Sequence, residues 1–381
     1  MTNINRKLIV KGIYVHIPFC MQKCFYCDFA SFAKQSNDVK KEYVKKLCAE
    51  IKTNKDKYEI SEGATIYFGG GTPSCIDSTL IEKIVNALKE NGFWKNPEEV
   101  SIEVNPGTAN LEKLKAFKDF GFDRLSFGVQ SLNNNELKAI GRIHNANEAI
   151  ESIELAKKAG FKRINADLMY GLPFQTIESY KETIDRLLNT GIKHISAYAL
   201  TLEEGTLLYK LVNDGKTVLP SDKDVEIMYD LTIDKLAIAG LKRYEVSNFA
   251  TKGEESKHNL VYWNYEPYLS FGSAACSSLI GKRIINPSII RDYIKGKEAD
   301  VENLDSDTQL AEYMFMGLRK TAGVDLIEAK NRYGIEVYEK FKKALDKAIE
   351  EKLVDYDVQK QNLKLTRRGM KFGNQIFEIF L

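Results

Sequence analysis

Short apolar runs alternate with segments of helical periodicity through the first half of the chain. The apolar, β-rich runs are IYVHIP, ATIYFGGG, VSIEVNPG, DRLSFGVQS, RINADLMYGLP and HISAYALTLE. Each is followed by a helical or irregular crossover, such as STLIEKIVNALKENG. Strands joined in this way run parallel with right-handed connections. The pattern predicts an α/β fold, a partial (β/α)6 TIM-like barrel, although periodicity alone does not exclude a doubly wound sheet.

After the last of these runs the regular alternation of strands and helices ends, and two further regions follow. A helix is predicted near residues 221–241, and the polar loop TKGEESKHN then leads into VYWNYEPYLSFGS. From about residue 300, helical patterns, two short strands (VDYDV and LKLT) and a final helix, RGMKFGNQIFEIFL, indicate a helical, winged-helix-like domain. We therefore expect a barrel over 1–205, a barrel extension with a loop over 206–299, and a C-terminal domain over 300–381.

Composition excludes several classes of protein. The 381 residues are 44% hydrophobic and 28% charged, with a net charge of +2, as in ordinary globular proteins. Neither this charge nor any basic stripe on the winged segment favours nucleic acid as a partner. The sequence contains no signal-peptide pattern and no apolar run long enough to cross a bilayer. We expect a cytoplasmic protein.

Three of the six cysteines form one short motif. Cys20, Cys24 and Cys27 follow the first strand, at the end where barrel active sites are built. In a cytosolic protein such thiols bind metal more often than they form disulfides. Three thiolates in one loop suit a [4Fe–4S] cluster with one iron left open, which is typical of a reacting site. The alternative is a zinc site with His16 as fourth ligand.

The motif Cys20-x3-Cys24-x2-Cys27, with the aromatic Tyr26, resembles the radical S-adenosylmethionine (SAM) superfamily. That resemblance implies that the amino and carboxylate groups of SAM bind the open iron. Further segments resemble the oxygen-independent coproporphyrinogen III oxidase family, from about residue 12 to the end of the chain. They are YFGGGTPS, IEVNPGT, RLSFGVQS, GRIH, ADLMYGLPFQT, YALTLEEGT, EYMFMGLR and LTRRG.

The same resemblance implies a set of SAM contacts. Arg142 can pair with a carboxylate through two parallel hydrogen bonds, and Glu103 can accept from hydroxyls or an ammonium. Taken singly, each position is also compatible with an ordinary surface, helix-end or core residue. The implied cofactor-binding residues are Tyr14, Tyr26, Gly70, Gly71, Thr72, Glu103, Gln130, Arg142, Asp167 and Ala199.

Two departures from the oxidases point to another branch of that family. The oxidases carry a further cysteine where this chain has Phe29, and their N-terminal segment is longer. HemW-type heme chaperones resemble this chain in both respects and in the motif His258-Asn-Leu-Val-Tyr-Trp263. The resemblance implies heme as ligand, an unidentified acceptor protein that can be membrane-bound, and an electron donor such as flavodoxin or ferredoxin.

The heme ligand and the activity both have alternatives. Histidine is a common ligand of heme iron, so His258 is the predicted ligand, although a loop histidine is more often solvated. Cys276 stands where other members tend to show histidine, and it is either a thiolate ligand or an inert buried thiol. The competing functions are a coproporphyrinogen III oxidase and a radical SAM enzyme that modifies heme. No catalytic residue is assigned.

Overall fold

A twelve-stranded sheet organises most of the molecule. The computed structural model describes residues 8–381. The strand order is β14-β13-β12-β11-β1-β4-β5-β6-β7-β8-β10-β9. Six consecutive neighbours in this order are parallel and come from the predicted runs: β1 (Leu8–Ile17), β4 (Tyr58–Gly70), β5 (Val100–Val104), β6 (Arg124–Gln130), β7 (Arg163–Tyr170) and β8 (His194–Ala199). The predicted α/β partial barrel is confirmed.

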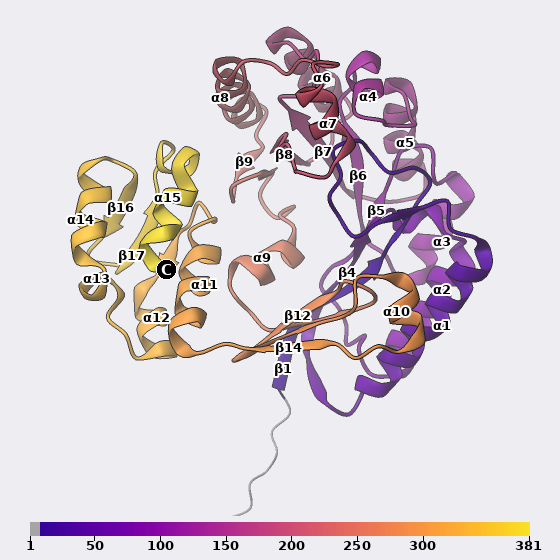
Figure 1. Ribbon diagram of the computed structural model, residues 1–381, viewed down its shortest axis with the longest axis horizontal. Helices are drawn as coiled ribbons and strands as arrows, with labels where there is room; N and C mark the ends of the chain where they lie inside the picture. Colours follow the sequence, from indigo (N-terminus) through magenta and orange to yellow (C-terminus); the bar gives the residue numbers. More distant parts are fainter. Residues whose placement is uncertain (1–7) are drawn as a thin grey trace, which may run out of the picture.

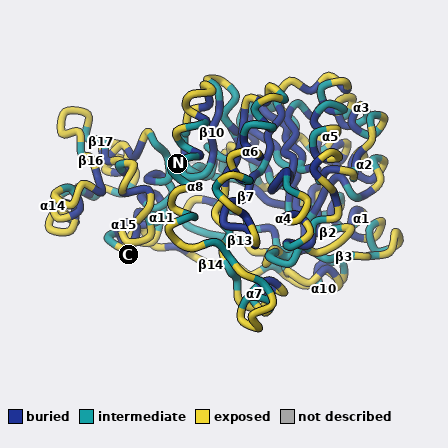
Figure 2. Tube along the Cα trace, turned by 90° about the horizontal axis from the view of Figure 1, so that it is seen from above, coloured by how far each residue is buried: buried dark blue, intermediate teal, exposed yellow. Residues whose placement is uncertain are grey.

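Helices cover the outer side of this sheet, as Figure 1 shows for those on the right of the view. They are α1 (Asn37–Asn54), α2 (Ser78–Glu90), α3 (Leu111–Phe120), α4 (Asn134–Ala139), α5 (Ala146–Lys158) and α6 (Ile177–Asn189). Every residue of β6 is buried, as expected for a central parallel strand. In Figure 2 the buried residues are concentrated in the barrel, and many exposed residues lie on the surrounding helices and loops. The apolar core therefore lies between the strands and these helices.

The barrel is extended at both edges of the sheet. After α7 (Leu207–Asn213) and α8 (Asp222–Ile238), β9 (Lys242–Arg243) and β10 (Asn248–Ala250) pair antiparallel beyond β8. At the other edge β11 (Tyr268–Phe271) runs parallel to β1. An antiparallel group follows β11, and it consists of β12 (Cys276–Leu279), β13 (Lys282–Ile285) and β14 (Asp300–Asn303), with α10 (Ile290–Lys295) between the last two.

The segment around His258 is not the predicted loop. It forms helix α9 (Lys257–Trp263). Ser256 caps this helix by accepting a hydrogen bond from the Asn259 N–H, and Glu99 accepts from the N–H groups of Lys257 and His258. These two caps satisfy the backbone donors of the first turn. The loop prediction was wrong because Glu99, which lies far away in the sequence, completes the helix start.

The C-terminal part has its own apolar core. Helices α11 (Ser306–Gly317), α12 (Leu326–Tyr333), α13 (Val337–Lys340) and α14 (Lys342–Glu350) pack with a small sheet of order β15-β17-β16. Its strands are β15 (Val324–Asp325), β16 (Val354–Asp357) and β17 (Asn362–Leu365). The predicted domain boundaries at 205 and 299 stay predictions, since the sheet continues across both of them. Among the described residues no helix is long and apolar enough to span a membrane.

The predicted final helix is divided into three short pieces. They are η2 (Gly369–Phe372), α15 (Gly373–Phe377) and η3 (Glu378–Phe380). A Cβ on Gly369 would lie 1.8 Å from the Leu353 carbonyl oxygen, so a side chain cannot be accommodated there. This close backbone contact packs η2 directly against Leu353, the residue before β16.

Glu99 is a buried ionic link between the barrel and α9. Its side chain has no exposed surface, and its Oε2 lies 2.7 Å from Nη2 of Arg163. Burial alone would raise the pKa of Glu99, but Arg124, Arg163 and the helix N–H groups outweigh it and lower that pKa. The Glu99 carboxylate therefore stays ionised in the folded protein.

We predict that Glu99→Gln lowers the free energy of unfolding by about 3 kcal/mol, because the buried Arg124 loses a nearby counter-charge and Arg163 loses one of its three carboxylate partners. Urea denaturation at neutral pH measures this loss. The matched control is Glu98→Gln, since Glu98 and its partner Lys257 are half-exposed; the control should change stability by less than about 1 kcal/mol. Equal losses in the two variants would contradict the role given to Glu99.

Candidate functional site

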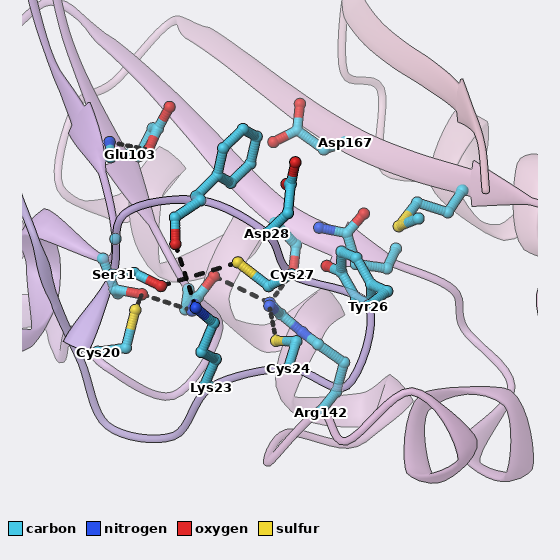
Figure 3. A pocket seen from close by; sticks show the side chains of 18 of the residues that line it. Cys20, Lys23, Cys24, Tyr26, Cys27, Asp28, Ser31, Glu103, Arg142 and Asp167 are labelled. Carbon is cyan, nitrogen blue, oxygen red and sulfur yellow. Dashed lines mark hydrogen bonds between the residues drawn. The ribbon is translucent and has the colours of Figure 1, made fainter. Parts of the chain in front are cut away.

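A cavity of ≈ 410 Å³ lies at the C-terminal ends of the barrel strands. This is the end at which barrels of this type carry their binding sites. Figure 3 shows the cysteines on one side of the cavity and the carboxylates of Glu103 and Asp167 on another. Most of the predicted site residues line it: Cys20, Cys24, Tyr26, Cys27, Gly70, Gly71, Thr72, Glu103, Gln130, Arg142, Asp167 and Ala199.

The loop that carries the three cysteines is held at both its base and its tip. At the base, β2 (Phe19–Cys20) pairs with β3 (Phe32–Ala33). At the tip, the Phe25 N–H donates to the Ile140 carbonyl at 3.0 Å. Gln22 Nε2 donates to the carbonyl of Gly141, also at 3.0 Å. The loop is therefore ordered by contacts within the protein, and the thiols are positioned in advance of any ligand.

Each cysteine sulfur has a polar side chain beside it. Thr72 Oγ1 donates to Cys20 Sγ at 3.6 Å, and Arg142 Nη1 donates to Cys24 Sγ at 3.4 Å. Cys27 Sγ lies 3.8 Å from the Ser31 hydroxyl. Burial raises the pKa of the Cys20 and Cys27 thiols. Hydrogen-bond donors at the sulfurs are what a cluster of thiolate-bound irons would use, because they stabilise negative charge there.

The geometry also bears on the zinc alternative. No group of three or more His, Cys, Asp or Glu side chains within residues 8–381 is placed to hold a single metal ion. In a cubane each cysteine binds a different iron, so its ligands need not converge on one point. His16 has both ring nitrogens engaged: Nε2 donates to the Ala30 carbonyl at 3.1 Å, and Nδ1 accepts from Tyr14 at 3.0 Å. The donor set fits a cluster better than zinc.

The glycine segment at the end of β4 contacts the cysteine loop through its backbone. Gly70 has a φ of +114°, and a Cβ there would lie 2.5 Å from the His16 ring. A Cβ on Gly71 would lie 2.7 Å from the Phe19 carbonyl oxygen and 3.0 Å from Cys20 Sγ. Larger residues would push the cysteine loop away from β4. The glycines are required for this close approach.

Glu103 and Asp167 form an acidic side of the cavity. Glu103 accepts hydrogen bonds from the Tyr67 hydroxyl at 2.9 Å and the Gly70 N–H at 3.1 Å. Burial, and then the charge of Asp167, raises the pKa of Glu103 to about 7. Burial likewise raises the pKa of Asp167, which accepts from Asn165 at 2.7 Å. Within residues 8–381 neither carboxylate forms an ion pair, although Arg124 acts on both from a distance. Such carboxylates suit a ligand that brings hydroxyls or an ammonium group.

Arg142 and Gln130 form the side of the cavity next to Cys24. Arg142 Nη2 donates to Asn105 Oδ1 at 2.9 Å and also to the Gly128 carbonyl. Its Nε is buried and has no hydrogen-bond partner. Gln130 follows an irregularity in β6 and has a φ of +67°. An unpartnered buried donor and a strained backbone are both common where a ligand completes the site.

Sequence reasoning missed several side chains that line the cavity. Asn105 directly follows β5 and donates to Thr72 Oγ1 at 2.8 Å. A polar residue immediately after a predicted strand was the available signal. Ser126 and Tyr198 point into the same cavity from β6 and β8. Their alternation with apolar neighbours indicated an inward direction, although no motif singled them out.

Three predicted residues lie outside the cavity lining. Tyr14 is half-buried on β1, and its hydroxyl donates to His16 Nδ1. Cys276 lies on β12, and its Sγ is 3.9 Å from the Ser277 carbonyl oxygen. His258 is 1% exposed, with Nδ1 2.8 Å from Thr65 Oγ1 and Nε2 2.7 Å from the Tyr262 hydroxyl. Burial lowers the pKa of His258 to about 3. No ring nitrogen of His258 is free in this arrangement.

A column of aromatic rings nevertheless connects His258 to the cavity. Its ring stacks on Tyr67 with centroids 5.1 Å apart, and Tyr67 stacks on Tyr14 at 6.2 Å. Tyr67 bonds to Glu103, and Tyr14 bonds to His16, which holds the cysteine loop through Ala30. We infer that α9 supports the cavity from the barrel interior.

The raised pKa of Glu103 predicts a pH effect on stability. Between pH 4.5 and about 7 the folded state binds a proton that the unfolded state releases, so stability falls as the pH rises. Glu103→Gln should therefore stabilise the ligand-free protein at pH 8 by up to about 3 kcal/mol and have little effect at pH 4.5. Urea denaturation at the two pH values measures this, with the exposed Glu82→Gln as control. A pH-independent effect would contradict the assignment.

The comparisons with known proteins agree with this geometry. Residues 14–187 match the radical SAM superfamily, and residues 304–372 match the HemN C-terminal domain. The heme chaperone HemW of Lactococcus lactis is 37% identical, with 97% of this chain and 96% of the relative covered. HemW of Bacillus subtilis is 36% identical, with 98% and 99% covered.

A solved structure shows the same fold. Coproporphyrinogen III oxidase (HemN) from Escherichia coli superposes with a TM-score of 0.83 at 22% identity, covering 98% of this chain and 90% of that one. Superfamily membership implies a [4Fe–4S] cluster and SAM. From its full-length similarity to the HemW proteins, the chain belongs to the HemW family of the radical SAM superfamily.

Proposed function

We propose that this chain is a heme chaperone of the radical SAM type. In this proposal it binds a [4Fe–4S] cluster, SAM and heme, and passes heme to an acceptor protein, with flavodoxin or ferredoxin as electron donor. The observation that carries the proposal is similarity to heme chaperones over nearly the whole length of both chains. Phe29 at the position of the oxidases' additional cysteine supports it.

The cavity residues fit both resident groups. Cys20, Cys24 and Cys27 would hold the cluster. The buried Nε of Arg142 has no hydrogen-bond partner within residues 8–381, and the carboxylate of SAM would supply one. When bound and reduced, the cluster supplies an electron for cleavage of the SAM sulfonium. Glu103 and Asp167 would accept hydrogen bonds from SAM hydroxyl or ammonium groups. Thr72 and Arg142 would keep donating to the cysteine sulfurs.

An apolar rim beside the cavity supports heme as the further ligand. Met21 and Phe29, both on the cysteine loop, are 56% and 66% exposed. Leu207 and Tyr198 are also exposed, and the Leu208 N–H donates to Phe25 on the same loop. We call Met21, Phe29, Tyr198 and Leu207 the apolar rim. Of these four, Phe29 and Tyr198 line the cavity itself. Exposed apolar side chains at a binding cavity suit a flat apolar ligand.

We predict that the double variant Met21→Ser and Phe29→Ser binds heme about tenfold more weakly, since the porphyrin face loses apolar contact. Anaerobic heme titrations followed by absorbance measure the affinity, and mixing with apo-acceptor proteins measures transfer. The matched control is Ile238→Ser, because Ile238 is 88% exposed at the end of α8, away from the rim. Unchanged heme affinity in the double variant would remove the rim from the proposal.

The role of His258 as heme ligand is tested separately. Ligation would require its ring to leave Thr65 or Tyr262, and we expect the hydrogen bonds to prevent this. His258→Ala should then leave the heme spectrum unchanged while lowering stability by about 2–4 kcal/mol, as for other truncations of buried rings. Tyr262→Phe is the companion variant, because it frees Nε2 and keeps the packing. If the first variant abolishes and the second strengthens heme binding, His258 is the ligand after all.

An assay of carbon dioxide release tests the alternative function, oxidation of coproporphyrinogen III. The chaperone proposal predicts no carbon dioxide release from coproporphyrinogen under anaerobic conditions with SAM and reductant. Product analysis of heme after the same incubation tests for a heme-modifying activity. Turnover at enzymatic rates in either assay would overturn the proposal.

A further inference from the structure

A second cavity lies at the junction between the barrel and the C-terminal core. It encloses ≈ 350 Å³ and is separate from the cysteine cavity. Its walls come from the β9–β10 connection, the residues just after α11, the end of β17 and the C-terminal turns: Val246, Arg319, Leu365, Met370, Lys371, Phe372, Gly373, Asn374, Gln375 and Phe377. Binding cavities are often found at such domain junctions.

Arg319 is the unusual residue of this junction cavity. Its guanidinium lies over the rings of Phe315, Trp263 and Phe377, at 4.4, 5.2 and 5.6 Å from the centroids. Its Nε is buried without a hydrogen-bond partner, and within residues 8–381 its guanidinium forms no ion pair with a carboxylate. Three aromatic rings thus fix a guanidinium whose donors are unused.

The neighbouring groups do not neutralise Arg319. Lys371, on the cavity wall, is itself paired with Glu226 and Asp230 of α8, 2.7 Å from each. Glu245 is buried and attracts Arg319 electrostatically, but no ion pair joins them. Glu245 instead accepts from the Ser247 N–H at 3.2 Å. Trp263 Nε1 is a second buried donor without a partner.

We propose that the junction cavity binds a carboxylate group, with Arg319 as its principal donor. The planar fork of a guanidinium matches a carboxylate through two parallel hydrogen bonds. A doubly charged phosphate fits less well, because Lys371, the other cation on the cavity wall, is already paired with Glu226 and Asp230. The amide side chains of Asn374 and Gln375 lie on the same wall and can donate to the second oxygen.

Two sources could supply this carboxylate. One is a free small dicarboxylate, and the other is a propionate of heme, in which case the inference rests on the proposed function. Apolar walls from Val246, Met370 and Phe372 surround the charged group and are compatible with either source. The experiment therefore has one arm for each.

The first arm uses Trp263 as an internal reporter. The chain has 2 tryptophans, so Trp94→Phe leaves Trp263 as the emitter. In that background we expect succinate, added at constant ionic strength against chloride, to change the emission saturably and to raise the melting temperature. Arg319→Gln should raise the succinate concentration that gives half of the emission change at least tenfold. Arg368→Gln, which removes an exposed charge from the same region, should leave it unchanged.

The second arm compares heme with heme dimethyl ester, whose propionates carry no charge. If heme is the source, Arg319→Gln weakens heme binding about tenfold and does not affect the ester. If Arg319→Gln unfolds the protein, Arg319→Lys replaces it. Lysine keeps the positive charge but cannot form two parallel hydrogen bonds to a carboxylate, so the affinity for the ligand should fall only in part. Succinate and heme responses that are both independent of Arg319 would overturn the inference. A protein that binds succinate through Arg319 but binds no heme would contradict the proposed function and leave the inference standing.

Discussion

The arrangement of the cavity depends on direct backbone contact between the first strand and the glycine segment after β4. The Gly71 N–H donates to the Ile17 carbonyl at 2.9 Å, and the Thr72 N–H donates to that of Phe19 at 2.8 Å. These bonds place Cys20 beside Thr72. They also bring the Gly70 N–H to Glu103. Since a side chain at Gly70 or Gly71 would separate the two segments, the thiols and the carboxylate are positioned together.

Side chains inside the barrel connect the cavity to helix α9. The rings of His258, Tyr67 and Tyr14 stack in one column between the helix and the cavity. On its other side α9 meets the C-terminal core, where Arg319 lies over Trp263. The motif around His258 thus joins the cysteine cavity to the junction cavity. This gives the motif a structural role that does not require its histidine to bind iron.

The sequence predicted those parts of the site that depend on local order. Cys20 ends β2, Glu103 is the penultimate residue of β5, and Asp167 lies in the C-terminal half of β7, and parallel strands bring such positions toward one edge of the sheet. The burial of His258 was not predictable, because its partner Thr65 lies 193 residues away in the chain. Arg319 was missed for the same reason: its three rings come from separate elements. Tertiary contacts of this kind leave no periodicity in the sequence.

The central claim is that three cysteines hold a cluster whose remaining iron binds SAM. The most direct measurement combines iron and acid-labile sulfide analysis with electron–nuclear double resonance of the reduced, anaerobically reconstituted protein. With SAM labelled by ¹⁵N at its amino group, the account predicts about four irons and four sulfides per chain and a nitrogen coupling to the cluster. Zinc in place of iron and sulfide, or a cluster spectrum unaffected by labelled SAM, would contradict it.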